Sequence, residues 1–268
     1  MAALKPERFL TRYGPWALVA GASEGIGASF AHALAIRGLN LVLLARRAVP
    51  LKSLAADLSQ QHGVQSRVLA LDLTSPGLHR AVAEATEDLE IGLLVCNAAL
   101  SLMSAFVELD IDDVLRSVDL NVRAPLVLGH LFGRRMAERG RGGIIFMSSV
   151  AGIIGSPYSA TYAGSKAFAL SFGDSLWAEL EPRGVDVLTC AAGPTETPTY
   201  AQVRTSSFPP AMNPDRVVRA ALAALGRRPR VVPGLFNRLT SLLLVPLPRT
   251  TTLRMIAAQT RKFATRRH

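Results

Sequence analysis

The chain has 268 residues, 49% of them hydrophobic and 19% charged, which is enough apolar material for one large domain or two small ones. This composition excludes a disordered chain. The formal net charge is +10, and the excess is confined to one end, because residues 216–268 hold 12 basic side chains and no acidic one. The basic character therefore belongs to the C-terminal segment and not to the whole surface.

The first twelve residues mix acidic and basic side chains and lack the apolar centre of a signal peptide. The two cysteines, Cys96 and Cys190, each lie in an apolar run that is typical of a buried strand. A chain with only two cysteines, both expected to be buried, is typical of a reducing compartment. We therefore expect a cytoplasmic protein, with membrane association left open by the C-terminal segment.

Short runs rich in Val, Ile and Leu alternate with longer segments of helical spacing along most of the chain. Each run is apolar throughout, as a strand covered on both faces must be, which indicates a parallel sheet flanked by helices. The sequence thus predicts a doubly wound α/β domain. The expected strands are 16–20, 40–45, 67–71, 91–96, 143–148 and 185–191, and the expected helices are 26–37, 51–61, 78–88, 111–135 and 162–180.

The last quarter of the chain is rich in proline, which predicts loops, a short helix near residues 215–225 and a strand near residues 231–232. Its arginines are interleaved with the apolar run 239–247, which is too short to span a bilayer. Such a segment suits an ordinary solvated or packed tail, an anionic membrane surface, an acidic or acylated substrate, or a partner subunit. Nucleic acid is disfavoured, because aromatic residues are few and no binding motif appears. We predict one domain over residues 1–233 and a basic, partly apolar extension over residues 234–268.

The first expected strand runs into a glycine-rich loop, residues 21–27, and then into a helix. Glycines there allow a tight turn and a close approach of the backbone to a pyrophosphate, which then faces the helix N-terminus. An ordinary strand-to-helix turn is the alternative, whereas a P-loop is excluded because no Gly-Lys-Ser/Thr follows. The order of strand, loop and helix predicts a dinucleotide site formed by Gly21, Ser23, Gly25, Ile26 and Gly27.

Arg46 and Arg47 follow the second expected strand, where a carboxylate would bind the ribose hydroxyls of NAD. Two guanidinium groups suit a 2′-phosphate instead. Glu24 adds an unhelpful negative charge nearby, and two ordinary solvated arginines are the alternative. We therefore expect NADP(H) in preference to NAD(H).

Tyr162 and Lys166 stand four residues apart on an expected helix, one turn above each other, so the ammonium can lie beside the phenol. A neighbouring positive charge favours the phenolate, so we expect a lowered pKa of Tyr162. A phenol tuned in this way exchanges a proton with an alcohol or a ketone near neutral pH.

These motifs, taken in chain order, resemble those of the short-chain dehydrogenase/reductase family over about residues 14–198. The resemblance implies a Rossmann fold with a seven-stranded parallel sheet, an NAD(P)-binding domain that also contains the substrate site, and a homodimer or homotetramer. The motifs that carry it are Gly21-x-x-x-Gly25-x-Gly27, Asn97-Ala98-Ala99, Asn121, Ser149 and Tyr162-x-x-x-Lys166.

The resemblance also assigns roles to these side chains. Tyr162 would exchange the proton with the substrate oxygen, Ser149 would hydrogen-bond the same oxygen, and Asn121 would position a water. Lys166 would lower the phenol pKa and hold the nicotinamide ribose, and no metal is needed. Ser148 is the alternative serine, but the spacing to Tyr162 favours Ser149. The remaining cofactor contacts expected by resemblance are Asp72 and Leu73 at the adenine, Asn97 and Ala98 under the cofactor, and Gly193, Thr195 and Thr197 at the nicotinamide.

The sequence departs from the family pattern at four positions, of which none carries a reacting group. Ala20 stands where Thr is usual, Cys96 and Ala99 stand where Asn and Gly are usual, and Ala192 replaces a Pro. The changes at Ala20, Cys96 and Ala99 are expected to loosen hydrogen bonds near the glycine loop and the fourth strand, so they bear on cofactor affinity more than on catalysis.

The substrate pocket is expected between the loops 100–106, 153–159 and 194–214. Residues 198–210, with Tyr200 and Phe208, resemble a lid over an apolar compound. The segments 13–17 and 37–40 resemble those of the branch that reduces 3-oxoacyl thioesters or 17-oxosteroids. We therefore predict an NADP(H)-dependent oxidoreductase that interconverts a ketone and a secondary alcohol. The alternative is a non-catalytic NADP(H)-binding sensor or scaffold that acts through its basic tail.

Overall fold

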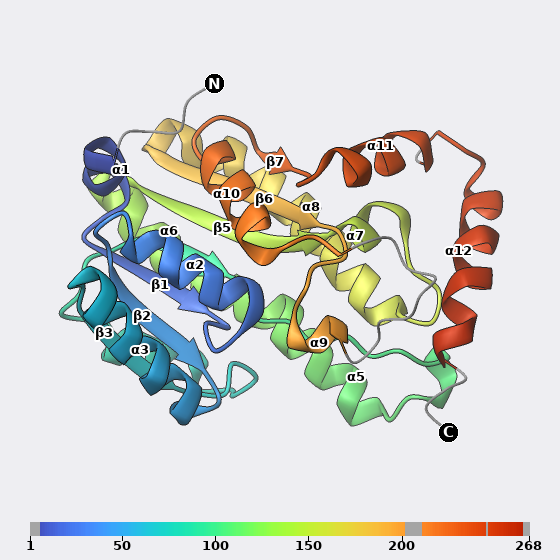
Figure 1. The fold of residues 1–268 in the computed structure, drawn as a ribbon, viewed down its shortest axis with the longest axis horizontal. Helices are drawn as coiled ribbons and strands as arrows, with labels where there is room; N and C mark the ends of the chain where they lie inside the picture. Colours follow the sequence, from blue (N-terminus) through green and yellow to red (C-terminus); the bar gives the residue numbers. More distant parts are fainter. Residues whose placement is uncertain (1–5, 202–210, 245, 265–268) are drawn as a thin grey trace.

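The computed structural model describes residues 6–201, 211–244 and 246–264, and a seven-stranded parallel sheet forms its centre (Figure 1). The strand order is β3-β2-β1-β4-β5-β6-β7, so the direction of winding reverses between β1 and β4. Ligands of such sheets bind at the carboxyl ends of the strands beside this reversal. The strands are β1 (Trp16–Ala20), β2 (Asn40–Ala45), β3 (Ser66–Ala70), β4 (Ile91–Cys96), β5 (Gly142–Ser149), β6 (Val185–Ala192) and β7 (Arg230–Val231).

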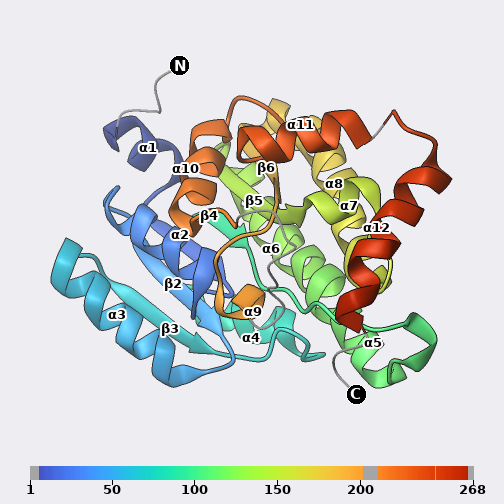
Figure 2. The ribbon, with the colours of Figure 1, turned by 45° about the vertical axis from the view of Figure 1, so that its right-hand side comes forward.

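Helices cover both faces of the sheet (Figures 1 and 2). One face packs against α2, α3 and α10, and the other against α4, α6 and α8. The helices are α1 (Pro6–Tyr13), α2 (Gly25–Ala35), α3 (Ala48–His62), α4 (Leu78–Ala85), α5 (Ile111–Val118), α6 (Ala124–Arg139), α7 (Val150–Ile154), α8 (Ala160–Leu180), α9 (Pro198–Ala201), α10 (Pro214–Ala224), α11 (Leu235–Leu244) and α12 (Arg249–Ala264).

The apolar strands follow from this two-sided cover. In β1, Ala17 and Val19 face one layer of helices while Leu18 and Ala20 face the other, so no position along the strand is left for a polar side chain. The predicted fold class is confirmed. Three of the predicted strands, 16–20, 40–45 and 91–96, have the bounds that the structure shows.

The C-terminal region differs from its prediction. The expected short helix and strand are present as α10 and β7, but α11 and α12 occupy residues that were expected to be loops. The prolines explain the error, because Pro233 lies ahead of α11 while Pro246 and Pro248 lie between the two helices, where proline is tolerated. The boundary between domain and extension at residue 233 stays a prediction. Within the described parts of the chain, no helix combines the length and the hydropathy that crossing a bilayer requires.

A buried ionic cluster attaches the N-terminal helix to the sheet. Tyr13 is fully buried at the end of α1, and its hydroxyl donates to Asp186 Oδ2 of β6 at 2.7 Å. Arg12 pairs with the same carboxylate. Burial, together with the negative charge of Asp186, raises the pKa of Tyr13, so the phenol stays a neutral donor. The pairing supplies the partners that a buried carboxylate needs.

We expect Tyr13→Phe to lower the free energy of unfolding by about 1.5–3 kcal/mol, because a hydrogen bond to a buried charged group is lost. Urea unfolding measures this change. Tyr158→Phe is the matched control, since none of the hydrogen bonds among the described residues involves the Tyr158 hydroxyl. An equal loss of stability in the two variants would contradict the role given to the cluster.

Candidate active site

The glycine loop is shaped by contacts that exclude side chains. Gly21 has a φ of +85°, and a Cβ there would lie 2.7 Å from the backbone of Ala98. A Cβ at Gly27 would lie 1.9 Å from the carbonyl oxygen of Gly21, which also accepts a hydrogen bond of 3.0 Å from Asn97 Nδ2. The loop after β1 and the end of β4 are therefore locked together. This fits a close approach of the loop backbone to a pyrophosphate.

The start of α2 completes the cradle. Gly25 begins the helix, and the first turn contains no acidic side chain that would oppose an anion. Ser23 lies in the turn and is partly exposed, and Ile26 packs against the core beneath it. All the loop residues predicted from the sequence lie at this one turn. The shape of the turn fits the pyrophosphate of a dinucleotide.

The loop after β6 comes directly against the glycine loop. A Cβ added at Gly25 would lie 2.9 Å from Thr197 Cγ2. Thr195 is buried, and its hydroxyl donates to the carbonyl oxygen of Gly193 at 2.9 Å. The structure thus places Thr197 next to the cradle, and Thr195 and Gly193 lie in the same loop. Phe208 and the rest of segment 202–210 of the expected lid lie outside the described residues.

Asp72 and Leu73 follow β3, on the side where adenine contact was predicted. Leu73 is buried, whereas the carboxylate of Asp72 accepts bonds from the backbone amide and the hydroxyl of Thr74, at 2.9 and 2.8 Å. These bonds lower the pKa of Asp72, and the charge of Arg116 adds to the effect. The carboxylate is thus fixed and ionised at the rim of the nucleotide site.

The two arginines after β2 have different surroundings. Arg47 pairs with Glu24 of the glycine loop at 2.5 Å, which neutralises the negative charge that the sequence places there. Arg46 is exposed, and its charge helps to lower the pKa of Asp72. One guanidinium is therefore held by the loop and the other faces the rim.

Lys166 of α8 is buried at the carboxyl end of β5. Its ammonium donates to the carbonyl oxygen of Met147 at 2.8 Å and lies 5.5 Å from the centre of the Tyr162 ring. Burial lowers the pKa of Lys166 to about 8. The lysine and the phenol converge, as the four-residue spacing predicts.

The predicted pKa of Tyr162 is wrong in direction. Burial raises the pKa of this phenol, and a side-chain hydrogen bond with Ser149 offsets the rise only in part. Lys166 does not reverse it, because its ammonium bonds to a backbone carbonyl and has itself a lowered pKa. Tyr162 is therefore protonated at neutral pH in this structure and is a proton donor.

The two adjacent serines have different partners. The Ser148 hydroxyl is buried and donates to the carbonyl oxygen of Lys166 at 2.7 Å, so it ties β5 to α8. Ser149 caps α7, where its oxygen accepts from the amide of Ala151 at 3.2 Å, and it also bonds to Tyr162. The Ser149 hydroxyl thus stands beside the phenol, while the Ser148 proton is used within the fold.

Asn121 lies in a π-helical turn, Asp119–Arg123, that divides the predicted helix 111–135 into α5 and α6. Such turns often mark functional sites, because the extra residue redirects a side chain. The Asn121 amide exchanges two 2.8 Å bonds with the backbone of Leu100 and donates to Ser165 Oγ at 3.1 Å. It therefore joins the loop after β4 to the helix that carries Tyr162 and Lys166. The water that the resemblance assigns to it stays a prediction.

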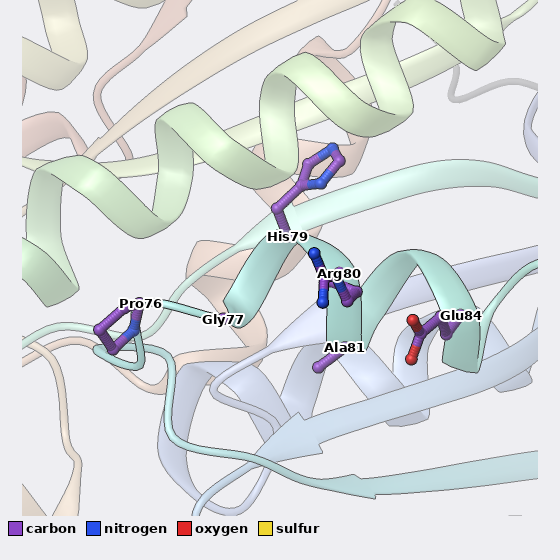
Figure 3. A pocket seen from close by; sticks show the side chains of 6 residues that line it. All are labelled: Pro76, Gly77, His79, Arg80, Ala81 and Glu84. Atoms are coloured by element: carbon purple, nitrogen blue, oxygen red, sulfur yellow. The ribbon is translucent and has the colours of Figure 1, made fainter.

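A hollow of about 610 Å³ lies elsewhere, on the segment around the start of α4 (Figure 3). It is lined by Pro76, Gly77, His79, Arg80, Ala81 and Glu84, all from one stretch of chain. None of the predicted catalytic residues lines it. We therefore place the chemistry at the end of β5, where the polar groups converge, and not at this hollow.

A family model described as short chain dehydrogenase matches residues 15–207. The chain belongs to the short-chain dehydrogenase/reductase family. It is accordingly an oxidoreductase of the kind that acts on alcohols and carbonyl compounds. Members of this family bind NAD(P)(H), which agrees with the cradle at Gly21–Gly27.

Two curated relatives illustrate the range of this similarity. A 7beta-hydroxysteroid dehydrogenase of Clostridium sardiniense is 32% identical over 233 residues, covering 86% of this chain and 89% of its own. A very-long-chain 3-oxoacyl-CoA reductase of Phaeosphaeria nodorum is 36% identical over 232 residues, with coverages of 83% and 67%.

Solved structures of the family superpose closely on this one. A structure from a study of 7beta-hydroxysteroid dehydrogenase stereoselectivity gives a TM-score of 0.87 at 29% identity, covering 93% of this chain and 99% of that one. A short-chain dehydrogenase from Sphingobium yanoikuyae in complex with NADPH gives 0.77 at 32% identity, with coverages of 88% and 97%.

Two residues of this dehydrogenase/reductase site had no role in the sequence analysis. Ser165 lies between Tyr162 and Lys166, accepts from Asn121 and donates to the carbonyl oxygen of Tyr162 at 2.7 Å. Its place between two predicted catalytic residues was the available signal. Asn237 of α11 fills the space in front of Gly193, where a Cβ would lie 2.4 Å from its amide. Nothing in the sequence pattern indicated that contact.

We expect Lys166 to lose its proton near pH 8 in the free protein, because burial disfavours the ammonium. The chain contains only four lysines, so NMR of the lysine side-chain carbons labelled with ¹³C can follow each one through a pH titration. One signal should titrate near pH 8, well below the others, and should vanish in Lys166→Arg. Four signals that all titrate above pH 10 would contradict the described burial.

Proposed function

We propose that the protein is an NADP(H)-dependent oxidoreductase that interconverts a ketone and a secondary alcohol on an apolar, acyl or steroid-like substrate. The observation that carries the proposal is the convergence of Ser149, Tyr162 and Lys166 at the carboxyl end of β5. These three groups meet beside a glycine cradle that fits a dinucleotide.

The bound dinucleotide supplies or accepts the hydride. Tyr162, which burial keeps protonated, donates its proton to the carbonyl oxygen in the direction of reduction. Ser149 accepts from the Ala151 amide, so its own proton is available to the same carbonyl oxygen, where it stabilises the developing negative charge. Lys166 holds positive charge 5.5 Å from the phenol ring and so stabilises the phenolate that is left. The protonated phenol is the state of Tyr162 that ketone reduction requires.

Ser149→Ala and Tyr162→Phe should each lower kcat for ketone reduction, by about 10²-fold and at least about 10³-fold, because a donor to the substrate oxygen is lost. Ser148→Ala is the matched control, since its hydroxyl bonds within the fold; it should lower thermal stability but change kcat only a few-fold. NADPH oxidation is the readout, and NADPH binding should persist in all three variants. A larger loss of kcat in Ser148→Ala than in Ser149→Ala would reverse the assignment of the serines.

The proposed preference for NADP(H) rests on Arg46. Among the described residues no salt bridge occupies its guanidinium, whereas Arg47 is paired with Glu24. A 2′-phosphate near the end of β2 would meet Arg46 without first breaking an ion pair. The Sphingobium yanoikuyae relative, solved in complex with NADPH, supports this choice.

Arg46→Ala should reduce the ratio of kcat/KM for NADPH to that for NADH by at least about tenfold, the value of one charge-assisted contact to a phosphate. Arg219→Ala, an exposed arginine of α10, should leave the ratio unchanged. Equal kcat/KM values for both cofactors in the wild-type protein would refute the preference, whatever the variants do.

The proposed substrate class rests on the relatives and on the apolar rim of the site. Ser104 donates its amide to the carbonyl oxygen of Tyr158 at 3.0 Å, so the loop after β4 and the loop after α7 are joined. Phe106 and Val107, beyond that junction, are largely exposed. Apolar side chains left in water beside a site suit an apolar ligand. Assays should compare long-chain 3-oxoacyl-CoA, oxosteroid and small aromatic ketones; activity on the last group alone would contradict this class.

We also propose a homodimer or homotetramer. Ile111, Leu115 and Val118 stand at helical spacing on α5 with their side chains exposed, and Leu126 of α6 is exposed as well. Such a stripe is typical of helix pairing between subunits. A reducing, cytoplasmic location stays a proposal, supported by Cys96 and Cys190, which are free and buried.

A further inference from the structure

Helix α11 presents five apolar side chains to solvent, while Asn237 and Ser241 face the protein. Leu235, Phe236, Leu239, Leu242 and Leu243 fall on one face of the helix and are between 51% and 75% exposed. We call these five residues the α11 apolar face. On the opposite side Ser241 is buried, and Asn237 lies against Gly193. A core-packing helix has the reverse arrangement.

The α11 apolar face is too large to be an ordinary surface feature. Burying one Leu or Phe side chain contributes about 1.5–3 kcal/mol, so five contiguous ones are costly to leave in water. Monomeric proteins rarely expose such contiguous patches without a partner. The face therefore marks a contact surface.

The charges around the face select its partner. Arg238 on α11 and Arg249 and Arg254 on α12 are exposed, and residues 216–268 contain no carboxylate side chain. A second copy of the same surface would bring arginines against arginines. An anionic surface with an apolar interior matches both the charges and the leucines.

A hollow at the N-terminal end of α11 has the same dual character. It measures about 350 Å³ and is lined by Met212, Arg216, Gly234, Leu235, Phe236 and Asn237. A guanidinium set among apolar side chains suits an amphiphile that carries a negative charge. With only 10 residues, α11 is suited to lying in a membrane interface and not to crossing it.

We propose that the α11 apolar face docks the protein on an anionic lipid membrane, with the neighbouring arginines on lipid phosphates. The face adjoins the catalytic elements, because α11 packs on α7, the helix that Ser149 caps. A Cβ at Gly155, just after α7, would lie 3.3 Å from Leu253 of α12. Figures 1 and 2 show both helices along one side of the domain. This docking would let an apolar ketone reach Tyr162 from the bilayer, an inference that rests on the proposed function.

Vesicle co-sedimentation of the full chain tests the docking. Vesicles of phosphatidylcholine mixed with phosphatidylglycerol should bind the protein at least about tenfold more tightly than pure phosphatidylcholine vesicles, and added salt should weaken the binding. Leu242→Ser with Leu243→Ser should reduce binding at least tenfold. The matched control is Ile36→Ser with Val49→Ser, which changes two exposed apolar side chains outside α11 and should bind as the wild type does.

Arg238→Gln with Arg254→Gln should remove most of the preference for anionic vesicles. Wild-type binding by the Leu242→Ser, Leu243→Ser variant would overturn the proposal. A second result would also overturn it: the wild-type protein does not bind vesicles, and light scattering shows a dimer for the wild type but a monomer for the Leu242→Ser, Leu243→Ser variant. The α11 apolar face would then be the contact between two copies of the chain. Tyr162→Phe should bind vesicles normally, so failure of the docking and failure of the proposed activity are separable.

Discussion

Two reciprocal hydrogen bonds hold the catalytic helix to the end of the central sheet. Lys166 Nζ donates to the carbonyl oxygen of Met147 on β5, and Ser148 Oγ of the same strand donates to the carbonyl oxygen of Lys166. Both bonds are buried, where an unmade bond is most costly. They fix the height of α8 over the strand and with it the distance from the ammonium to Tyr162. The convergence of the functional groups is thus a consequence of the hydrogen bonds between β5 and α8.

The buried contact between β5 and α8 also sets the electrostatics of the site. The burial that makes both bonds strong removes water from the ammonium and from the phenol, which lowers the pKa of Lys166 and raises that of Tyr162. The two shifts move the pKa values of the two groups apart, because the ordinary values of lysine and tyrosine, 10.5 and 10.0, lie close together. Tyr162 therefore keeps its proton until a substrate oxygen accepts it, as a general acid requires.

The sequence predicted the sheet well because its strands are covered on both faces, so that runs such as 40–45 and 91–96 contain only side chains that tolerate complete burial. The sequence did not predict α11, because the prolines on either side of it indicated loops. Motif spacing placed Tyr162 and Lys166 together, since four residues make one helical turn. It gave the wrong pKa direction for the phenol, because spacing carries no information on desolvation. The contact of Asn237 with Gly193 joins residues far apart in the chain, and only the folded structure reveals it.

The contact at Gly193 has a consequence for the length of the chain. Asn237 occupies the space that a Cβ on Gly193 would need, and its amide is itself held by the carbonyl oxygen of Pro233 at 2.9 Å. Helix α11 thus packs directly against the loop after β6. A chain truncated ahead of Asn237 would lose this contact, so the loop after β6 depends on α11 for its packing.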